Sequence, residues 1–342
     1  MKRLLIGLSA LALAAIAAHA LAQTGAVTWR SPVSSIVVPS QNTAISGWEA
    51  YKGRDATPST DQQLSDPILQ GAIDIHAHFG PDSYARQWDA FEIARLAQQR
   101  GMRGIVFKNH WSESAGLAFL VRRYAAPELE VFGSLSLNTP EGGINPEAVR
   151  YFAEVEGGFG KVVWMPTHDS EHEVTTRGEA RPYVRVSREG ALLPEVLEVL
   201  DMIARYDLTL ATGHVTVPEM FMILREARPR GVRRIIITHP NLGPMYTNPS
   251  LEELREAVSL GGYVEIVAGR LRRANRAEAI ATIRAIGPEH CIISTDSGLV
   301  GTPNTADALV MAARELRANG FTERELDLMF RRNPASVLGL SP

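Results

Sequence analysis

From Gly71 to the end of the chain, eight short apolar runs alternate with stretches of helical periodicity. Apolar spacing close to 3.6 residues predicts helices, including one that begins near Phe91 and ends before Gly101 and others over 192–203, 218–227, 251–260, 277–286 and 306–318. Strands that alternate with helices in this way form βαβ units and a parallel sheet. The eight predicted strands are Ala72–Ile75, Gly104–Phe107, Glu130–Phe132, Val162–Met165, Leu208–Ala211, Arg234–Thr238, Tyr263–Val267 and Cys291–Ser294.

Eight such units predict one α/β domain, a (β/α)8 TIM barrel over residues 71–342. The alternative is a doubly wound open sheet, but no G-x-G-x-x-G motif follows a predicted strand to favour it. Residues 23–70 are rich in Ser, Thr, Pro, Gln and Asp, with one β-like run over 35–38. We therefore expect an irregular N-terminal extension before the barrel.

The first 22 residues have the layout of a secretory signal peptide. Lys2 and Arg3 precede an apolar run over 4–18, and the small residues Ala20 and Ala22 then flank a cleavage point. A membrane anchor is the alternative, but the run is shorter than the roughly 20 residues that span a bilayer. We expect a bacterial protein that is periplasmic or secreted and leaves the membrane after cleavage.

Charge and cysteine content exclude several classes of partner and site. A formal net charge of -3 over 342 residues gives no reason to expect nucleic acid as a partner. One cysteine, Cys291, excludes an intramolecular disulfide and a multi-cysteine zinc finger. Any metal must therefore be held by histidines, carboxylates or a modified lysine. A small-molecule substrate is the expected partner, and a homo-oligomer remains open.

Histidines and one aspartate lie where the predicted strands end. The first strand leads into His76 and His78, whose i, i+2 spacing puts both side chains on one face. The fifth, sixth and eighth strands lead into His214, His239 and Asp296. Reactive side chains of such barrels come from the C-terminal ends of the strands. Imidazole and carboxylate ligands suit zinc and similar ions, so these residues predict a divalent metal site.

This order of ligands resembles the amidohydrolase superfamily, barrel hydrolases with His-x-His on strand one, His on strands five and six, and Asp on strand eight. The resemblance runs from Gly71 to the C-terminus and includes the Asn-Pro-Ala…Leu-Gly segment at 333–339. The segments Leu137-Asn138…Gly142–Pro146 and Val163–Thr167 are similar to an uncharacterised bacterial branch of that superfamily.

The resemblance implies a metal-dependent hydrolase that cleaves an ester, lactone or amide bond with a metal-activated hydroxide. It implies two zinc ions, with Asp296 as both a metal ligand and the catalytic group that moves the proton. The alternatives are a mononuclear decarboxylase or deaminase of the same superfamily, and a periplasmic binding protein without catalysis.

The fourth predicted strand departs from the superfamily pattern because it ends Val163–Thr167 without a bridging lysine or glutamate. Lys161 lies at its beginning, on the wrong rim. Lys108 instead follows the second strand at the catalytic end, where burial lowers an amine's pKa and favours the form that carbon dioxide modifies. Some superfamily members are similar in taking their bridging ligand from strand two. We therefore expect Lys108 to be a carbamate bridge between two ions; its alternatives are a substrate anchor or a lysine paired with an acid.

Five further residues are candidates for substrate binding. His110 has the strand parity of Lys108 and either faces the site or caps the next helix. His168 lies in a loop after the fourth strand and either lines the pocket or is exposed, as loop histidines more often are. Trp164 forms an apolar wall or packs in the core, Asn241 binds substrate, and Arg270 leaves the seventh strand at the correct rim to bind an anion.

Overall fold

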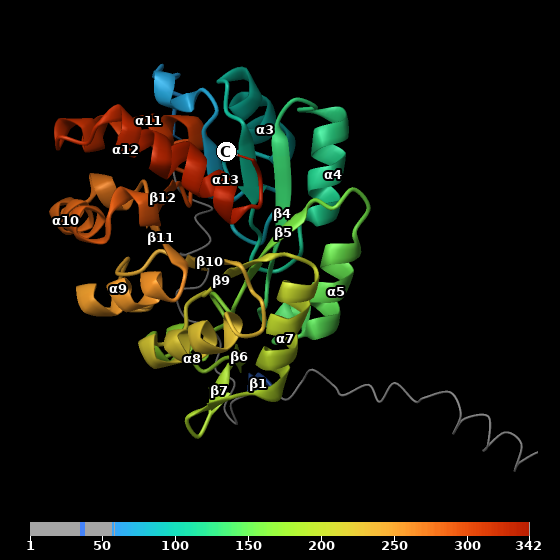
Figure 1. The fold of residues 1–342 in the computed structure, drawn as a ribbon. Helices are drawn as coiled ribbons and strands as arrows, with labels where there is room; N and C mark the ends of the chain where they lie inside the picture. Colours follow the sequence, from blue (N-terminus) through green and yellow to red (C-terminus); the bar gives the residue numbers. More distant parts are fainter. Residues whose placement is uncertain (1–34, 38–56, 58, 342) are drawn as a thin grey trace, which may run out of the picture. The chain divides into compact units, whose positions relative to one another are not determined.

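Eight parallel strands form one closed sheet in the computed structural model, which describes residues 35–37, 57 and 59–341 (Figure 1). Neighbouring strands follow one another along the chain, so the order in the sheet is the order in sequence. All eight predicted strands are confirmed. They are β2 (Ile73–Ala77), β3 (Gly104–Phe107), β4 (Glu130–Ser136), β5 (Gly160–Trp164), β9 (Thr209–Ala211), β10 (Arg234–Ile237), β11 (Gly262–Val267) and β12 (Cys291–Ser294).

The ring closes between the first and last strands. A parallel bridge joins Ala77 to Ser297, and the backbone N–H of His78 donates to the carbonyl of Ser297 at 2.8 Å. The N–H of Asp296 donates to the carbonyl of His76, also at 2.8 Å. Closure therefore brings the His-x-His segment directly beside the aspartate that follows β12, although about 220 residues separate them in the chain.

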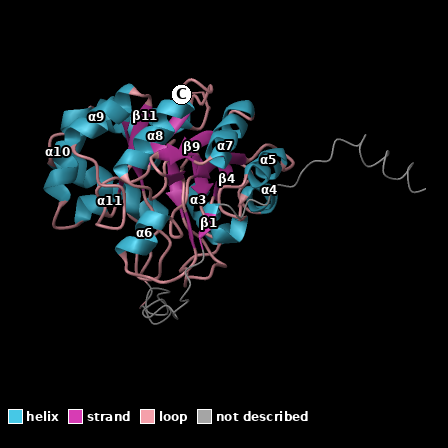
Figure 2. Cartoon of the chain, turned by 90° about the horizontal axis from the view of Figure 1, so that it is seen from below, coloured by secondary structure: helices cyan, strands magenta, loops and turns pink. Residues whose placement is uncertain are grey.

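Helices surround the strands, which occupy the centre in Figure 2. Side-chain caps fix where several of them begin: Asp89, Thr216 and Ser250 each form a capping box with a glutamate three residues later. The helices are α3 (Ala90–Gln99), α4 (Ala115–Tyr124), α5 (Pro146–Glu154), α6 (Glu171–Thr176), α7 (Pro194–Arg205), α8 (Val217–Ala227), α9 (Leu251–Ser259), α10 (Arg276–Ile286), α11 (Thr305–Ala318), α12 (Glu323–Asp327) and α13 (Asn333–Val337).

Two apolar cores stabilise the barrel. The larger lies between the strands and the surrounding helices, and the smaller fills the barrel interior around Ile75, Val106 and Trp164. The end of the chain, including Val337, packs into this interior core. Asn333 donates from its side chain to the carbonyl of Cys291 at 2.7 Å. The C-terminal segment therefore closes the barrel at the N-terminal ends of the strands and leaves the opposite rim open for a site.

The predicted extension contributes one described strand, β1 (Ile36–Val37), which pairs with β6 (Tyr183–Val184) in the loop after β5. A second small sheet joins β7 (Ser187–Arg188) to β8 (Ala191–Leu192). The predicted signal peptide, residues 1–22, lies outside the described residues. In the part of the chain that is described, no helix is long and apolar enough to cross a membrane.

Candidate metal centre

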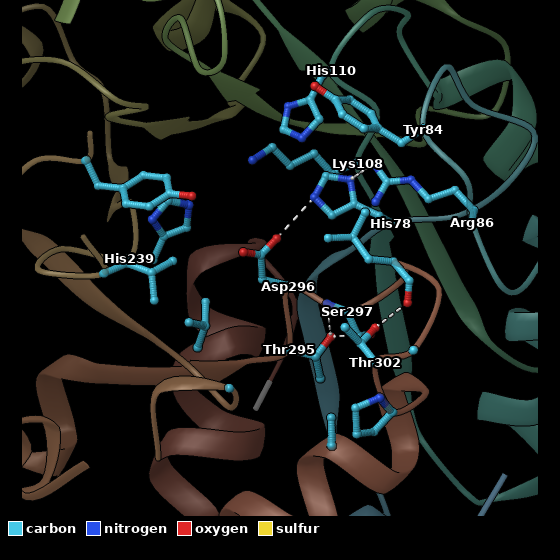
Figure 3. Close-up of a pocket in the computed structure, with 18 of the residues that line it drawn as sticks. His78, Tyr84, Arg86, Lys108, His110, His239, Thr295, Asp296, Ser297 and Thr302 are labelled. Carbon is cyan, nitrogen blue, oxygen red and sulfur yellow. Dashed lines mark hydrogen bonds and ion pairs between the residues drawn. The ribbon is translucent and has the colours of Figure 1, made fainter. Parts of the chain in front are cut away.

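A cavity of about 410 Å³ opens at the C-terminal rim of the barrel (Figure 3). Residues from the loops after seven of the eight strands line it, so it lies at the open end of the barrel axis. Its lining combines predicted metal ligands with residues for which no role was predicted. These residues are His78, Tyr84, Arg86, Lys108, His110, His168, His214, His239, Leu242, Tyr246, Val267, Gly269, Arg272, Arg273, Thr295, Asp296, Ser297, Leu299, Gly301, Thr302, Pro303 and Ala308.

The first histidine pair belongs to the His-x-His segment at the end of β2. The Nε2 atoms of His76 and His78 lie 3.3 Å apart, and each lies 3.1 Å from Oδ1 of Asp296. Asp296 has a positive φ of 49°, a backbone conformation that is uncommon for a residue other than glycine. The two histidines hold the pKa of Asp296 well below its usual value, although burial opposes this. Three ligand atoms thus converge on one point.

The second pair comes from the loops after β9 and β10. The Nε2 atoms of His214 and His239 also lie 3.3 Å apart. Gly213, before the first of these histidines, has φ of +67°, and a Cβ there would lie 2.4 Å from the carbonyl oxygen of Met165. Glycine is therefore needed where the chain turns from β9 to present His214 to the cavity.

Two buried glutamates fix the rings behind the ligand atoms. Oε1 of Glu265, on β11, accepts from Nδ1 of His76 at 2.8 Å, and Oε2 of Glu173, on α6, accepts from Nδ1 of His214 at 2.6 Å. Burial raises the pKa of Glu265, but the contacts with His76 and Ser294 prevail and lower it to about 2. An ionised carboxylate only accepts, so each ring carries its proton on Nδ1 and presents a bare Nε2 lone pair.

Lys108 follows β3, and its side chain is buried beneath the cavity. Its Nζ lies 3.1 Å from Nε2 of His76 and 4.0 Å from the centre of the Trp164 ring. Burial lowers the pKa of Lys108 from 10.5 to about 8, although Asp296 and the two buried glutamates oppose this shift. The amine therefore lies among the ligand atoms, on the predicted rim.

A further buried carboxylate, Asp74, holds the ligand-bearing backbone in place. Its Oδ1 accepts from the backbone N–H groups of His76, at 3.1 Å, and Thr295, at 3.0 Å. Its other oxygen accepts from the hydroxyls of Thr295 and Thr305. Burial raises the pKa of Asp74 above its usual value despite these hydrogen bonds. This residue connects β2 to the segment that carries Asp296.

These donors fit a divalent cation. Within each histidine pair, the two Nε2 atoms face each other at 3.3 Å. Two bare lone pairs at this distance would repel each other without a cation or a proton between them. Nδ1 of His239 is buried and has no hydrogen-bond partner among the described residues. The ligand types, imidazole and carboxylate, are those that zinc prefers. The arrangement therefore suits a divalent ion near His76, His78 and Asp296, with Lys108 within reach. His214 and His239 supply a second pair of nitrogen donors.

The profile of a family described as a "family of unknown function" (DUF6282) matches residues 71–265, more than half of the chain. The chain belongs to this family. A search of curated proteins gives no match.

Solved structures with a similar fold include an amidohydrolase from Pseudomonas aeruginosa, at 15% identity and a TM-score of 0.53, covering 81% of this chain and 100% of that one. A mutant organophosphorus hydrolase from Deinococcus radiodurans aligns at 18% identity and 0.53, covering 83% and 98%. An amidohydrolase from Burkholderia multivorans with bound zinc aligns at 13% and 0.53, covering 79% and 99%. At these identities the likeness is one of fold, and it confirms the predicted (β/α)8 barrel.

Among the predicted substrate-binding residues, His110 and His168 line the cavity. His168 is not exposed, although loop histidines more often are. The loop after β5 folds into α6, Glu173 accepts from Nδ1 of His168 at 2.9 Å, and the residue is only 6% exposed. His110 faces the site and does not cap α4, which begins after Ser114.

Three other candidates do not line the cavity. Trp164 lies beneath it in the barrel interior, with its ring 4.7 Å from that of His76. Asn241 takes a turn conformation with φ of 61° and donates from its side chain to the carbonyl of Pro249. Arg270 is buried and donates to the carbonyl of Pro240 at 3.0 Å. Their backbone positions are at the correct rim, but their side chains pack in the core or donate hydrogen bonds to loop carbonyls.

The carboxylates Asp74, Glu173 and Glu265 and the arginines at the cavity were not predicted from the sequence. Arg86, in the loop after β2, lies with Nη2 3.3 Å from Nδ1 of His78 and forms an ion pair with Asp82 at 2.7 Å. The arginines at 272 and 273 follow the one chosen from sequence, at 270, and they reach the cavity where it does not.

Proposed function

We propose that this chain is a metal-dependent hydrolase that cleaves an ester, lactone or amide bond of a small molecule, with two zinc ions as cofactors. The observation that carries the proposal is the placement of Asp296 against both histidines of the first pair, at the open rim of the barrel. Its Oδ1 faces the two rings, while the side chain keeps 28% of its surface exposed to the cavity. A carboxylate used only to bind metal needs no such exposure.

Different residues of the site would have different roles in hydrolysis. Bound divalent metals supply Lewis acidity and make water a nucleophile at neutral pH. The Asp296 carboxylate accepts the proton of the attacking water and returns it to the leaving group. Glu173 and Glu265 keep the rings of His214 and His76 oriented, since their hydrogen bonds fix both tautomer and ring angle. We also propose that Lys108, as a carbamate, is the ligand shared by the two ions.

We further propose that the substrate carries an anionic group. Arg272 and Arg273 line the cavity, are exposed, and form no ion pair that is found among the described residues. A guanidinium binds a carboxylate through paired hydrogen bonds. The test is a pair of esters with the same leaving group, one neutral and one with a carboxylate. Replacing both arginines with Gln should raise KM about 10-fold for the charged ester alone, and Arg276→Gln, which removes an arginine paired with Glu315, is the control.

The proposed function is tested by metal analysis together with a panel of carboxyl esters, lactones, amides and phosphotriesters. Zinc-loaded protein should hydrolyse at least one ester, lactone or amide, and Asp296→Asn should abolish this turnover. Asp201→Asn, an exposed aspartate paired with Arg230, is the control and should leave the rate unchanged. No hydrolysis above the blank, or an Asp296→Asn variant as fast as wild type, would contradict the proposal. One metal per chain with decarboxylation or deamination would favour the mononuclear alternative.

A further inference from the structure

His110 lines the cavity but belongs to neither facing pair of histidines (Figure 3). The residue follows β3 and is 5% exposed. Its Nδ1 lies 3.1 Å from Oγ1 of Thr167, and either atom of this pair is able to donate. The direction of this hydrogen bond decides what the ring presents to a ligand. If Nδ1 donates, Nε2 offers a lone pair; if Nδ1 accepts, Nε2 offers an N–H group.

The side chain of Asn138 has a fixed orientation next to this pair. Its Oδ1 accepts from the backbone N–H of Thr167 at 2.9 Å and from that of Asp169 at 3.3 Å. Its Nδ2 donates to the carbonyl of His110 and to Oγ1 of Thr167, both at 2.8 Å. Exchanging the amide's oxygen and nitrogen would place donor against donor and acceptor against acceptor. Asn138 is fully buried, so water does not relieve such contacts.

The hydroxyl oxygen of Thr167 therefore accepts from Asn138, and its hydrogen remains available to donate to another acceptor. The residue is fully buried, and the other hydrogen-bond partner of its hydroxyl among the described residues is Nδ1 of His110. Buried hydroxyls almost always donate, because an unpaired one costs free energy. The hydroxyl hydrogen thus goes to Nδ1, and the ring proton is on Nε2. No hydrogen bond of Nε2 to another described residue is found, and the ring lines the cavity.

We propose that His110 is a hydrogen-bond donor to the substrate, held in its neutral Nε2–H form by Asn138 and Thr167. Its acceptor is the substrate oxygen that gains negative charge during hydrolysis. His76 and His214 are held in the opposite form, since Glu265 and Glu173 accept from Nδ1 and leave Nε2 bare. The cavity thus contains histidines that bind cations and one that binds an anionic oxygen.

The surroundings make this donor rigid. The ring of His110 stacks on that of His78, with centroids 4.7 Å apart, and meets the edge of His168 at 4.2 Å. The hydrogen bonds through Asn138 and Thr167 join the loops after three neighbouring strands, β3, β4 and β5. Preorganised donors of this kind need no rearrangement when charge develops, and removing one from an oxyanion site typically slows turnover by about 100- to 1,000-fold. The sequence segments around 138 and 167 had no predicted role. In this proposal their role is to hold the ring of His110.

The tautomer is tested independently of activity. In metal-free protein with 15N-labelled histidine, two-bond 1H–15N correlation spectra distinguish the two neutral forms among the nine histidines, and His110→Gln assigns the signal. The wild type should show the Nε2–H pattern for His110. Thr167→Val should lose it, Thr167→Ser should restore it, and Thr282→Val, which removes a hydroxyl bonded within α10, should leave it unchanged. An Nδ1–H pattern in the wild type would overturn the inference.

The role toward substrate rests on the proposed function and has its own test. Methylphosphonate, a tetrahedral oxyanion, is titrated into zinc-loaded protein. We expect it to shift the Hε2 and Nε2 signals of His110 and to bind about 10-fold more weakly to Thr167→Val than to Thr167→Ser. With any ester that is turned over, Thr167→Val should lower kcat more than it raises KM. Methylphosphonate binding without effect on His110 would overturn the donor role; binding through His110 in a protein that hydrolyses nothing would refute the proposed function alone.

Discussion

Replacing Glu265 with Gln is the sharpest test of how the metal ligands are held. Its carboxylate accepts three hydrogen bonds: from Nδ1 of His76 at 2.8 Å, from Ser294 at 2.7 Å and from the backbone N–H of His239 at 3.0 Å. Glutamine has nearly the same shape but one oxygen where glutamate has two. Its NH2 group must therefore face a donor in either orientation.

Each orientation has a definite cost. If the NH2 group faces the backbone of His239, two buried donors are left unpaired, which costs about 1–3 kcal/mol of the free energy of unfolding. If it faces His76, the ring must accept at Nδ1 and carry its proton on Nε2, which removes the metal-binding lone pair. Losing such a partner typically lowers metal affinity by about 10- to 100-fold.

The assay is zinc binding by competition with a chelator, together with urea unfolding of the metal-free protein. Glu265→Gln should lose about 10- to 100-fold in zinc affinity, whereas Ser294→Ala, which removes one of the three donors, should lose less. Glu130→Gln, at the opposite rim and paired with Arg103, should change neither measurement. Unchanged zinc affinity and stability in Glu265→Gln would refute the reasoning that this carboxylate fixes the ring of His76.

Three other predictions address the remaining groups. Lys108→Ala should retain one zinc per chain by elemental analysis, and wild type should show a carbamate signal with 13C-bicarbonate; Lys161→Ala is the control, and two zinc ions in Lys108→Ala would contradict the bridge. Asp296→Asn should keep the fold and lose turnover, measured by circular dichroism and ester hydrolysis. Burial lowers the pKa of His214 to about 3 and that of His239 to about 4, from 6.5. The unfolded state therefore binds more protons, so the stability of metal-free protein should fall below pH 6.5, by about 1.4 kcal/mol per pH unit for each ring in urea unfolding; a flat profile would contradict this.

The barrel could be predicted because its evidence is local. Each strand is a short apolar run, and the predicted bounds of β3 and β12 agree with the structure at both ends. Five helices, α4, α5, α6, α12 and α13, were not assigned from apolar spacing. Of these, α6 (Glu171–Thr176) is six residues long and has one buried apolar side chain, Val174, so no periodicity is available to reveal it.

The placement of the candidate metal ligands at one rim could also be predicted, since a residue that ends a parallel strand lies on the catalytic rim whatever the loops do. The side chains that face the substrate cavity could not be predicted in the same way. Arg270 leaves β11 at the correct rim, yet its side chain is buried against Pro240, and Arg272 and Arg273 line the cavity instead. A shift of two residues within one short helical turn decides which arginine faces the ligand, and no pattern in the sequence fixes that turn.

The buried carboxylates that were not predicted differ in whether a sequence pattern could have revealed them. Tyr263 packs in the barrel interior and Val267 lines the cavity, so strand alternation places Glu265 between them on the same inward face. An acid there must meet a partner, and alternate strands of a barrel share a layer, which brings β11 to His76 on β2. Glu173 has no such signal. It reaches His214 because a polar loop folds into one short helix, and that helix is positioned by contacts with residues distant in the chain, such as His214 itself.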